Sequence, residues 1–161
     1  MRRHLLVILV LLSLLGCGRL HQQRGAHSAS STPPLVQSAV RVLRDPHTVR
    51  LEVLWVPKQK LTRMDLTPQL LERTGNRKTN DSAFQRSDLK GMLIDALQHA
   101  DIRQGSDPGD LRWACIFYDR QGARVLTMYF DGEGTKGLIQ STPVTSNGEV
   151  VRALERHFGL R

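Results

Sequence analysis

The residues between positions 38 and 56 alternate between apolar and polar, which is typical of β-strands because successive side chains point to opposite faces. Arg50 and Glu52 are interleaved with Val49, Leu51, Val53 and Trp55. An earlier apolar pair, Val40 and Val42, precedes a turn signal at residues 45–48. The pattern therefore predicts that these two apolar stretches form a β-hairpin.

Two helices are predicted in the middle of the chain. Thr67 and Pro68 suit the N-cap and first position of a short helix that runs toward Gly75, and a polar loop follows at residues 76–82. A longer helix begins near Ser87, because apolar residues recur there at the spacing of one helix face. These residues are Leu89, Met92, Leu93, Ala96, Leu97 and Ala100.

The next segments again have the period of strands. Residues 111–118 and 124–130 alternate in this way, and the Asp-Arg-Gln-Gly sequence at 119–122 is a strong hairpin-turn signal. A shorter third strand is predicted from Gly137 toward Val144. The two longer strands are expected to be central in the sheet.

A final helix is predicted after Ser146, because the apolar residues there recur with the helical period of 3.6 residues rather than the strand period of 2. Ser146 and Glu149 have the spacing of a capping box, and Gly159 suits the end of the helix. Asn147 and Gly148 would instead favour a hairpin turn at this point. The apolar face of the helix consists of Val150, Val151, Leu154 and Phe158.

The order of elements, ββ(α)α-βββα, predicts the α+β class. We expect an antiparallel sheet of about five strands with the two main helices on one face. A chain of 161 residues allows one ordinary domain plus additional segments. We assign the single domain to residues 38–161.

The first residues have the outline of a signal peptide. Arg2 and Arg3 precede an apolar stretch from Leu5 to Leu15, whose 11 residues are too few for a bilayer-spanning helix, which needs about 20. The stretch ends in Leu14-Leu15-Gly16-Cys17, which resembles the lipobox of bacterial lipoproteins.

This resemblance implies that the thiol of Cys17 receives diacylglycerol and that residues 1–16 are removed. Gly18 occupies the position at which aspartate tends to retain lipoproteins in the inner membrane. In a host with two membranes, the resemblance therefore implies the periplasmic face of the outer membrane. Residues 17–37 comprise the lipidated cysteine and a polar, flexible tether that lacks acidic residues.

The chain is basic, with 23 Lys and Arg against 15 Asp and Glu. Loss of Arg2 and Arg3 leaves 21 against 15, a net charge of +6. Such a charge favours anionic lipid, lipopolysaccharide or another acidic envelope polymer as a partner, with an envelope protein as the alternative, and the compartment argues against nucleic acid. The candidate contacts form one stretch of the sequence: Lys58, Lys60, Arg63, Arg73, Arg77 and Lys78.

Residues 132–137, Gly-Glu-Gly-Thr-Lys-Gly, match the letters of a dinucleotide-binding fingerprint. Extended sequence follows them rather than the helix that would receive a pyrophosphate, so a glycine-rich hairpin loop is the better interpretation and no cofactor is predicted. A small enzyme remains the rival hypothesis. It would use Asp131 and Glu133 in a pocket with Arg124 or Lys136.

The remaining nucleophiles and metal-binding side chains indicate no site. Cys115 is the only thiol left once Cys17 is acylated, so no internal disulfide is predicted, and its mid-strand position indicates an inert, buried thiol. No pair of histidines has the spacing of metal ligands on one helix face. The sequence thus predicts a lipid-anchored binding or accessory module of the envelope.

Overall fold

The computed structural model describes residues 33–60, 62–80, 84 and 88–159. These described residues all belong to one compact unit. The predicted signal peptide, Cys17 and residues 18–32 of the predicted tether lie outside the described residues. Within the described part, no helix is both long enough and apolar enough to cross a membrane.

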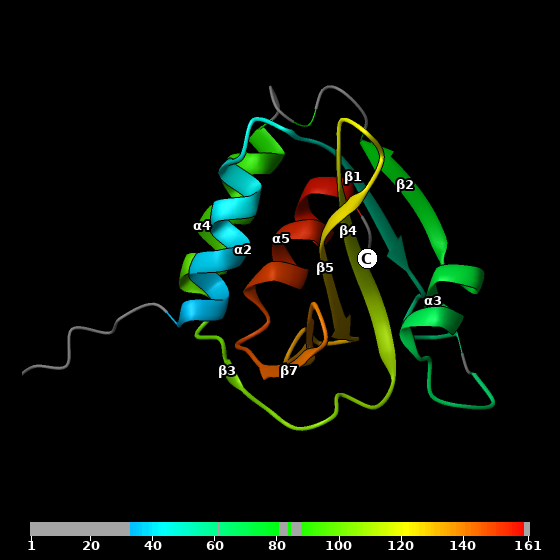
Figure 1. The fold of residues 1–161 in the computed structure, drawn as a ribbon. Coiled ribbons are helices and arrows are strands. Elements are labelled where there is room, and N and C mark those ends of the chain that lie inside the picture. The colour runs from blue at the N-terminus through cyan, green and yellow to red at the C-terminus, as the bar shows by residue number, and fades with distance from the viewer. Residues whose placement is uncertain (1–32, 61, 81–83, 85–87, 160–161) are drawn as a thin grey trace, which may run out of the picture. The chain divides into compact units, whose positions relative to one another are not determined.

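The described strands form one antiparallel sheet (Figure 1). Its seven strands lie in the order β2-β1-β4-β5-β6-β7-β3, so β4 and β5 are central and β2 and β3 are the edges. The α+β class and the antiparallel sheet are confirmed, whereas the expected number of about five strands is too low. The strands are β1 (Thr48–Trp55), β2 (Asn76–Asn80), β3 (Arg103–Gln104), β4 (Leu111–Asp119), β5 (Arg124–Asp131), β6 (Lys136–Ile139) and β7 (Thr142–Thr145).

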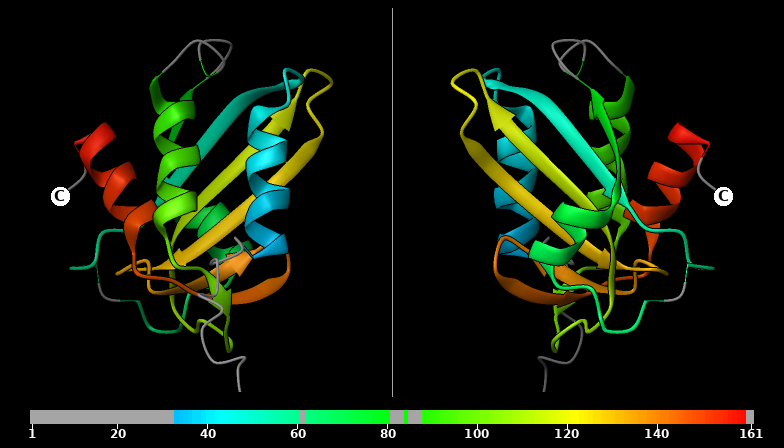
Figure 2. Two further views of the ribbon diagram at one scale, coloured as in Figure 1. Left: turned by 90° about the vertical axis from the view of Figure 1, so that its left-hand side faces the viewer. Right: turned by 90° about the vertical axis from the view of Figure 1, so that its right-hand side faces the viewer.

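Three helices cover one face of the sheet: α2 (Pro34–Arg44), α4 (Asp88–His99) and α5 (Glu149–Phe158). Figure 2 shows α4 between α2 and α5 in front of the strands. The buried faces of these helices pack on inward-facing strand residues such as Phe117 and Met128 in the larger apolar cluster. The two main helices therefore share a face, as predicted, and α2 joins them there.

The fourth described helix, α3 (Pro68–Thr74), lies on the opposite face. Its Leu71 is fully buried and packs in a second, smaller cluster with residues of β1 and β4. The predicted start of this helix is confirmed, because the Thr67 hydroxyl accepts a hydrogen bond from the Leu70 N–H (3.4 Å) and Pro68 is the first helical residue. The Thr67–Pro68 sequence thus determines where the helix on this second face begins.

The prediction that the chain opens with a β-hairpin is wrong in its first strand, because residues 34–44 form the helix α2. Val36, Val40 and Leu43 are buried and are spaced by four and then three residues, which places them on one helix face. Pro34 is tolerated at the start of the helix, where its missing N–H leaves no bond unmade. The folded domain consequently begins before Ser38, and residues 34–37 are helical rather than part of the tether.

Other differences concern short strands. Residues 76–80, at the start of the predicted polar loop, form β2, and residues 103–104, for which no strand was predicted, form β3. Both are edge strands, whose backbone can pair without an apolar side-chain pattern. The single strand predicted from Gly137 toward Val144 is instead the hairpin of β6 and β7, and Gln140 adopts a φ of +57° at its turn.

The final helix is confirmed, but its start differs from the predicted capping box. The Ser146 N–H donates to the carbonyl of Thr135, in the loop between β5 and β6 (2.8 Å). It is therefore not free for the Glu149 side chain. The Asn147 side chain instead accepts a hydrogen bond from the Glu149 N–H (3.1 Å), and Gly148 precedes the helix with a φ of +83°. Gly159 ends the helix in the left-handed conformation, as predicted.

Candidate functional site

The six basic residues predicted to contact an anionic surface do not share one face of the domain. Arg77 and Lys78 are consecutive in β2 and point to opposite sides of the sheet. Arg77 Nε pairs with Glu52 Oε1 (2.6 Å), whereas Lys78 Nζ donates to the carbonyl of Phe158 at the end of α5 (3.2 Å). The other four, Lys58, Lys60, Arg63 and Arg73, are exposed on α3 and the connection before it.

The glycine-rich segment is a hairpin loop between β5 and β6, as predicted. The Asp131 carboxylate accepts hydrogen bonds from the N–H and the hydroxyl of Thr135 (2.8 and 3.0 Å), and Gly134 adopts a φ of +71° in the turn. Glu133 forms an ion pair with Lys58 (2.9 Å). Asp131 therefore stabilises the loop, and Glu133 links it to the β1–α3 connection.

The residues of the rival enzyme hypothesis are not all brought together. Arg124 begins β5 and Asp131 ends it, which separates them by about 24 Å of extended strand. Arg124 instead pairs with Glu72 of α3 (2.6 Å), and Lys136 is exposed at the start of β6. The geometry therefore does not join the two loop carboxylates to Arg124.

The Cys115 side chain is fully buried in β4, and burial raises the pKa of its thiol to about 12. The thiol is therefore protonated at neutral pH, which agrees with the inert interpretation. Among the described residues, no group of three potential ligands could hold a metal ion. The described histidines, His47, His99 and His157, are all exposed.

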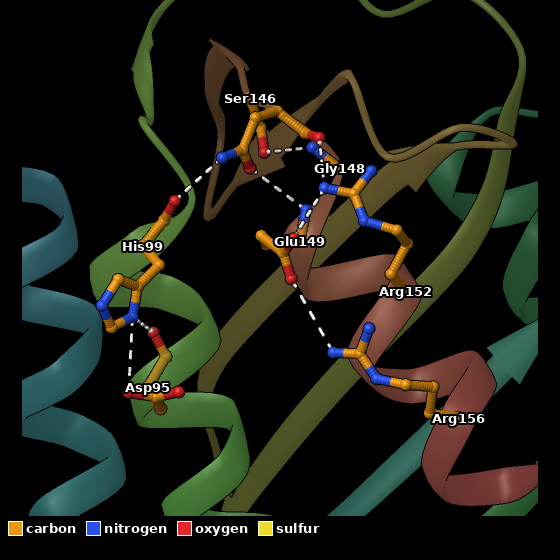
Figure 3. A network of polar contacts seen from close by, with 8 residues as sticks. Asp95, His99, Ser146, Gly148, Glu149, Arg152 and Arg156 are labelled. Carbon is orange, nitrogen blue, oxygen red and sulfur yellow. Dashed lines mark hydrogen bonds and ion pairs between the residues drawn. The ribbon is translucent and has the colours of Figure 1, made fainter.

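An open groove of about 430 Å³ lies between α4 and α5. Its lining includes Ala96 and Ala153, whose small side chains leave space between the two helices. A polar network follows its rim (Figure 3). There, Asn147 Nδ2 donates to the carbonyl of His99 (2.9 Å), which joins the end of α4 to the start of α5.

The charges around this α4/α5 groove are paired with one another. Arg152 and Arg156 both approach Glu149 (2.9 and 3.7 Å), and the hydrogen bond from Arg152 holds the pKa of Glu149 below its ordinary value. Across the groove, His99 Nδ1 lies 3.3 Å from the Asp95 carboxylate. Because its positive and negative side chains are paired, this groove suits an uncharged polar ligand or a peptide better than a phosphate.

A second groove, of about 440 Å³, lies on the other side of α4, against α2. Its lining residues are Gln37, Val40, Arg41, Arg44 and Gln98. These include two arginines and no acid, so the charge of this α2/α4 groove is positive where that of the α4/α5 groove is balanced.

A charged network lies on the opposite face of the sheet, where α3 meets the strands. Glu72 of α3 accepts two hydrogen bonds from Arg124 (3.0 and 2.6 Å) and one from the Tyr129 hydroxyl (2.6 Å). Burial alone would raise the pKa of Glu72, but the bonds from Arg124 and Tyr129 outweigh it and hold that pKa below its ordinary value. Burial, reinforced by the bond to Glu72, raises the pKa of Tyr129.

The same network continues across β1 and β4. Glu52 is only 7% exposed and accepts a hydrogen bond from the Tyr118 hydroxyl (2.7 Å) in addition to its ion pair with Arg77. The Arg50 guanidinium lies 4.0 Å from the centre of the Tyr118 ring, and its buried Nε has no hydrogen-bond partner in the described part of the chain. These contacts bind α3 and β2 to the central strands.

Sequence reasoning missed both the α3 network and the α2 arginines. Arg50 and Glu52 were assigned to a polar strand face, and the period of two does place them on one side of β1. Nothing local in the sequence, however, indicates that Tyr118, 66 residues after Glu52, bonds to it. Arg41 was missed because its helix was predicted to be a strand.

Comparison with known proteins identified no relative of this chain. The chain matches no family model, no curated protein and no solved structure.

Proposed function

We propose that this protein is a lipid-anchored lipoprotein of the cell envelope, and that its α+β domain is a binding or accessory module held at the membrane. The observation that carries the proposal is Leu14-Leu15-Gly16-Cys17 at the end of a short apolar stretch with a basic start. In a host with two membranes, the expected location is the periplasmic face of the outer membrane.

The shape of the domain surface is compatible with a binding module. Both grooves beside α4 are open at the outer surface of the helical layer, so a partner could reach either of them directly. Lipidation would supply stable attachment, because each buried methylene contributes about 0.8 kcal/mol and more than one acyl chain is implied. The candidate partners are anionic lipid, lipopolysaccharide or another envelope protein.

Metabolic labelling with a tagged fatty acid tests the anchor. We expect label in the wild-type protein and none in Cys17→Ser, because the Cys17 thiol is the proposed acylation site. Cys115→Ser is the matched control, since Cys115 is buried in β4, and it should retain the label. Absence of label from the wild-type protein, or equal label in Cys17→Ser, would contradict the proposal.

A further inference from the structure

The outer surface of α2 presents a stripe of polar side chains that leads into the α2/α4 groove. Gln37, Arg41 and Arg44 are spaced by four and then three residues, so they lie along one side of the helix. All three are exposed, and Gln98 of α4 faces them across the groove. The stripe and the groove together form one continuous surface.

This surface carries positive charge that the domain does not neutralise. Helix α2 contains no acidic residue, and neither Arg41 nor Arg44 forms an ion pair or a side-chain hydrogen bond with any residue that the structure describes. The nearest acid in the sequence is Asp45, whose carboxylate accepts a hydrogen bond from the His47 N–H (2.8 Å). By contrast, Arg124 and Arg152 have carboxylate partners.

The position of α2 in the chain places it near the proposed anchor. Its first residue, Pro34, is 17 residues after Cys17. The tether predicted from the sequence would, at that length, have a root-mean-square end-to-end distance of about 23 Å. The start of α2 would therefore remain close to the lipid surface, whereas other elements are joined to the anchor only through α2.

We propose that the α2/α4 groove docks on the anionic phospholipid headgroups of the membrane that holds the anchor. This inference rests on the proposed function. Planar guanidinium groups bind phosphate through paired hydrogen bonds, and the Gln98 side chain can donate a further bond to a headgroup oxygen. The α4/α5 groove is the weaker candidate for this ligand, because Glu149 already engages Arg152 and Arg156.

The test uses the full lipidated protein in vesicles of phosphatidylcholine, with or without phosphatidylglycerol. A fluorophore attached at Ser38→Cys, on the exposed side of α2, reports its distance from an acceptor dye in the headgroups. The buried Cys115 should not react with the fluorophore. We expect energy transfer to increase when phosphatidylglycerol is present and to decrease at high salt, because exposed charges are screened.

Arg41→Gln with Arg44→Gln should lower the ratio of docked to undocked protein about 25-fold, since each arginine near an anionic surface contributes about fivefold. The matched control is Arg73→Gln with Arg120→Gln, which removes two exposed arginines outside the groove and should behave like the wild type. Equal losses in the two double variants, or transfer that does not depend on phosphatidylglycerol, would overturn the docking site. Protein that fails to float with pure phosphatidylcholine vesicles would instead overturn the anchor.

Discussion

The two faces of the sheet are held by different kinds of interaction. On the helical face, α2, α4 and α5 bury aliphatic side chains against strand residues such as Phe117, Met128 and Phe130. On the opposite face, α3 buries Leu71 in a smaller apolar cluster, and Glu72 binds Arg124 and Tyr129 beside it. The helical layer therefore depends mainly on apolar burial, whereas the attachment of α3 also depends on charge.

This difference has consequences for stability. Apolar burial changes little with pH, so the helical face should respond to side-chain volume rather than to protonation. The ion pair of Glu72 with Arg124 exists only when the carboxyl group is ionised, so the α3 face should respond to acid.

Neighbouring residues of β4 provide the most direct test, because Phe117 faces the helical layer and Ile116 faces α3. Phe117 is fully buried, with its ring centre 5.7 Å from that of Phe84. Phe117→Ala should lower the free energy of unfolding by about 3–5 kcal/mol, and Ile116→Ala by about 2 kcal/mol. Urea unfolding measures both. An Ile116→Ala variant that loses as much as Phe117→Ala would remove the distinction between the two faces.

The parts of the fold that follow from apolar periodicity could be predicted from the sequence. Strands β1, β4 and β5 and helices α3, α4 and α5 were found because each buries one regular face or has a clear local cap. Helix α2 was missed because Val40 and Val42, two residues apart, were interpreted as a strand, although Val36 and Leu43 complete a helical face. Strand β2 was missed because an edge strand pairs through its backbone and its side chains are polar.

The candidate sites were less accessible to sequence reasoning. Residues 58 to 78 are close in sequence, yet the turn before β2 and the alternation within it send Arg77 and Lys78 to opposite faces of the sheet. The bond between Glu72 and Arg124 joins residues 52 positions apart, and no local pattern connects them. The resemblance to a lipobox could be noted because that motif is contiguous and requires no fold, and it stays a prediction.

Removing the charge of Glu72 should have the next largest effect. Glu72→Gln should lower the free energy of unfolding by about 1–2 kcal/mol at pH 7, since bonds to charged groups contribute more than neutral ones but Arg124 is half exposed. Glu155→Gln, on α5, is the matched control and should change stability by less than about 0.5 kcal/mol. If Arg124→Gln and Glu72→Gln proved fully additive in the double variant, their bond would contribute nothing.

The same pair of proteins should show the pH dependence of the α3 face. The pKa of Glu72 is lowered in the folded state, so its stabilisation is complete above the unfolded value of about 4.3 and is lost as the pH falls through the folded pKa. The stability difference between wild type and Glu72→Gln should therefore be constant from pH 7 to pH 5 and shrink in stronger acid. A difference that persists unchanged to pH 2 would show that Glu72 acts through its shape alone.

Two glycines, one beside each face, should give the smallest effects, and these should have opposite signs. A Cβ added to Gly91, on the exposed side of α4, would meet no atom within 4 Å, so Gly91→Ala should raise the free energy of unfolding by about 0.5–1 kcal/mol through helix propensity. A Cβ at Gly75, which ends α3, would lie 2.8 Å from the carbonyl oxygen of Leu71 and 3.4 Å from Leu54 Cβ. Gly75→Ala should therefore lower stability by about 1 kcal/mol, because the last turn of α3 would have to move at the Leu71 carbonyl. Thermal unfolding of both variants measures the two signs, and a stabilised Gly75→Ala would mean that the end of α3 adjusts to the added methyl group without cost.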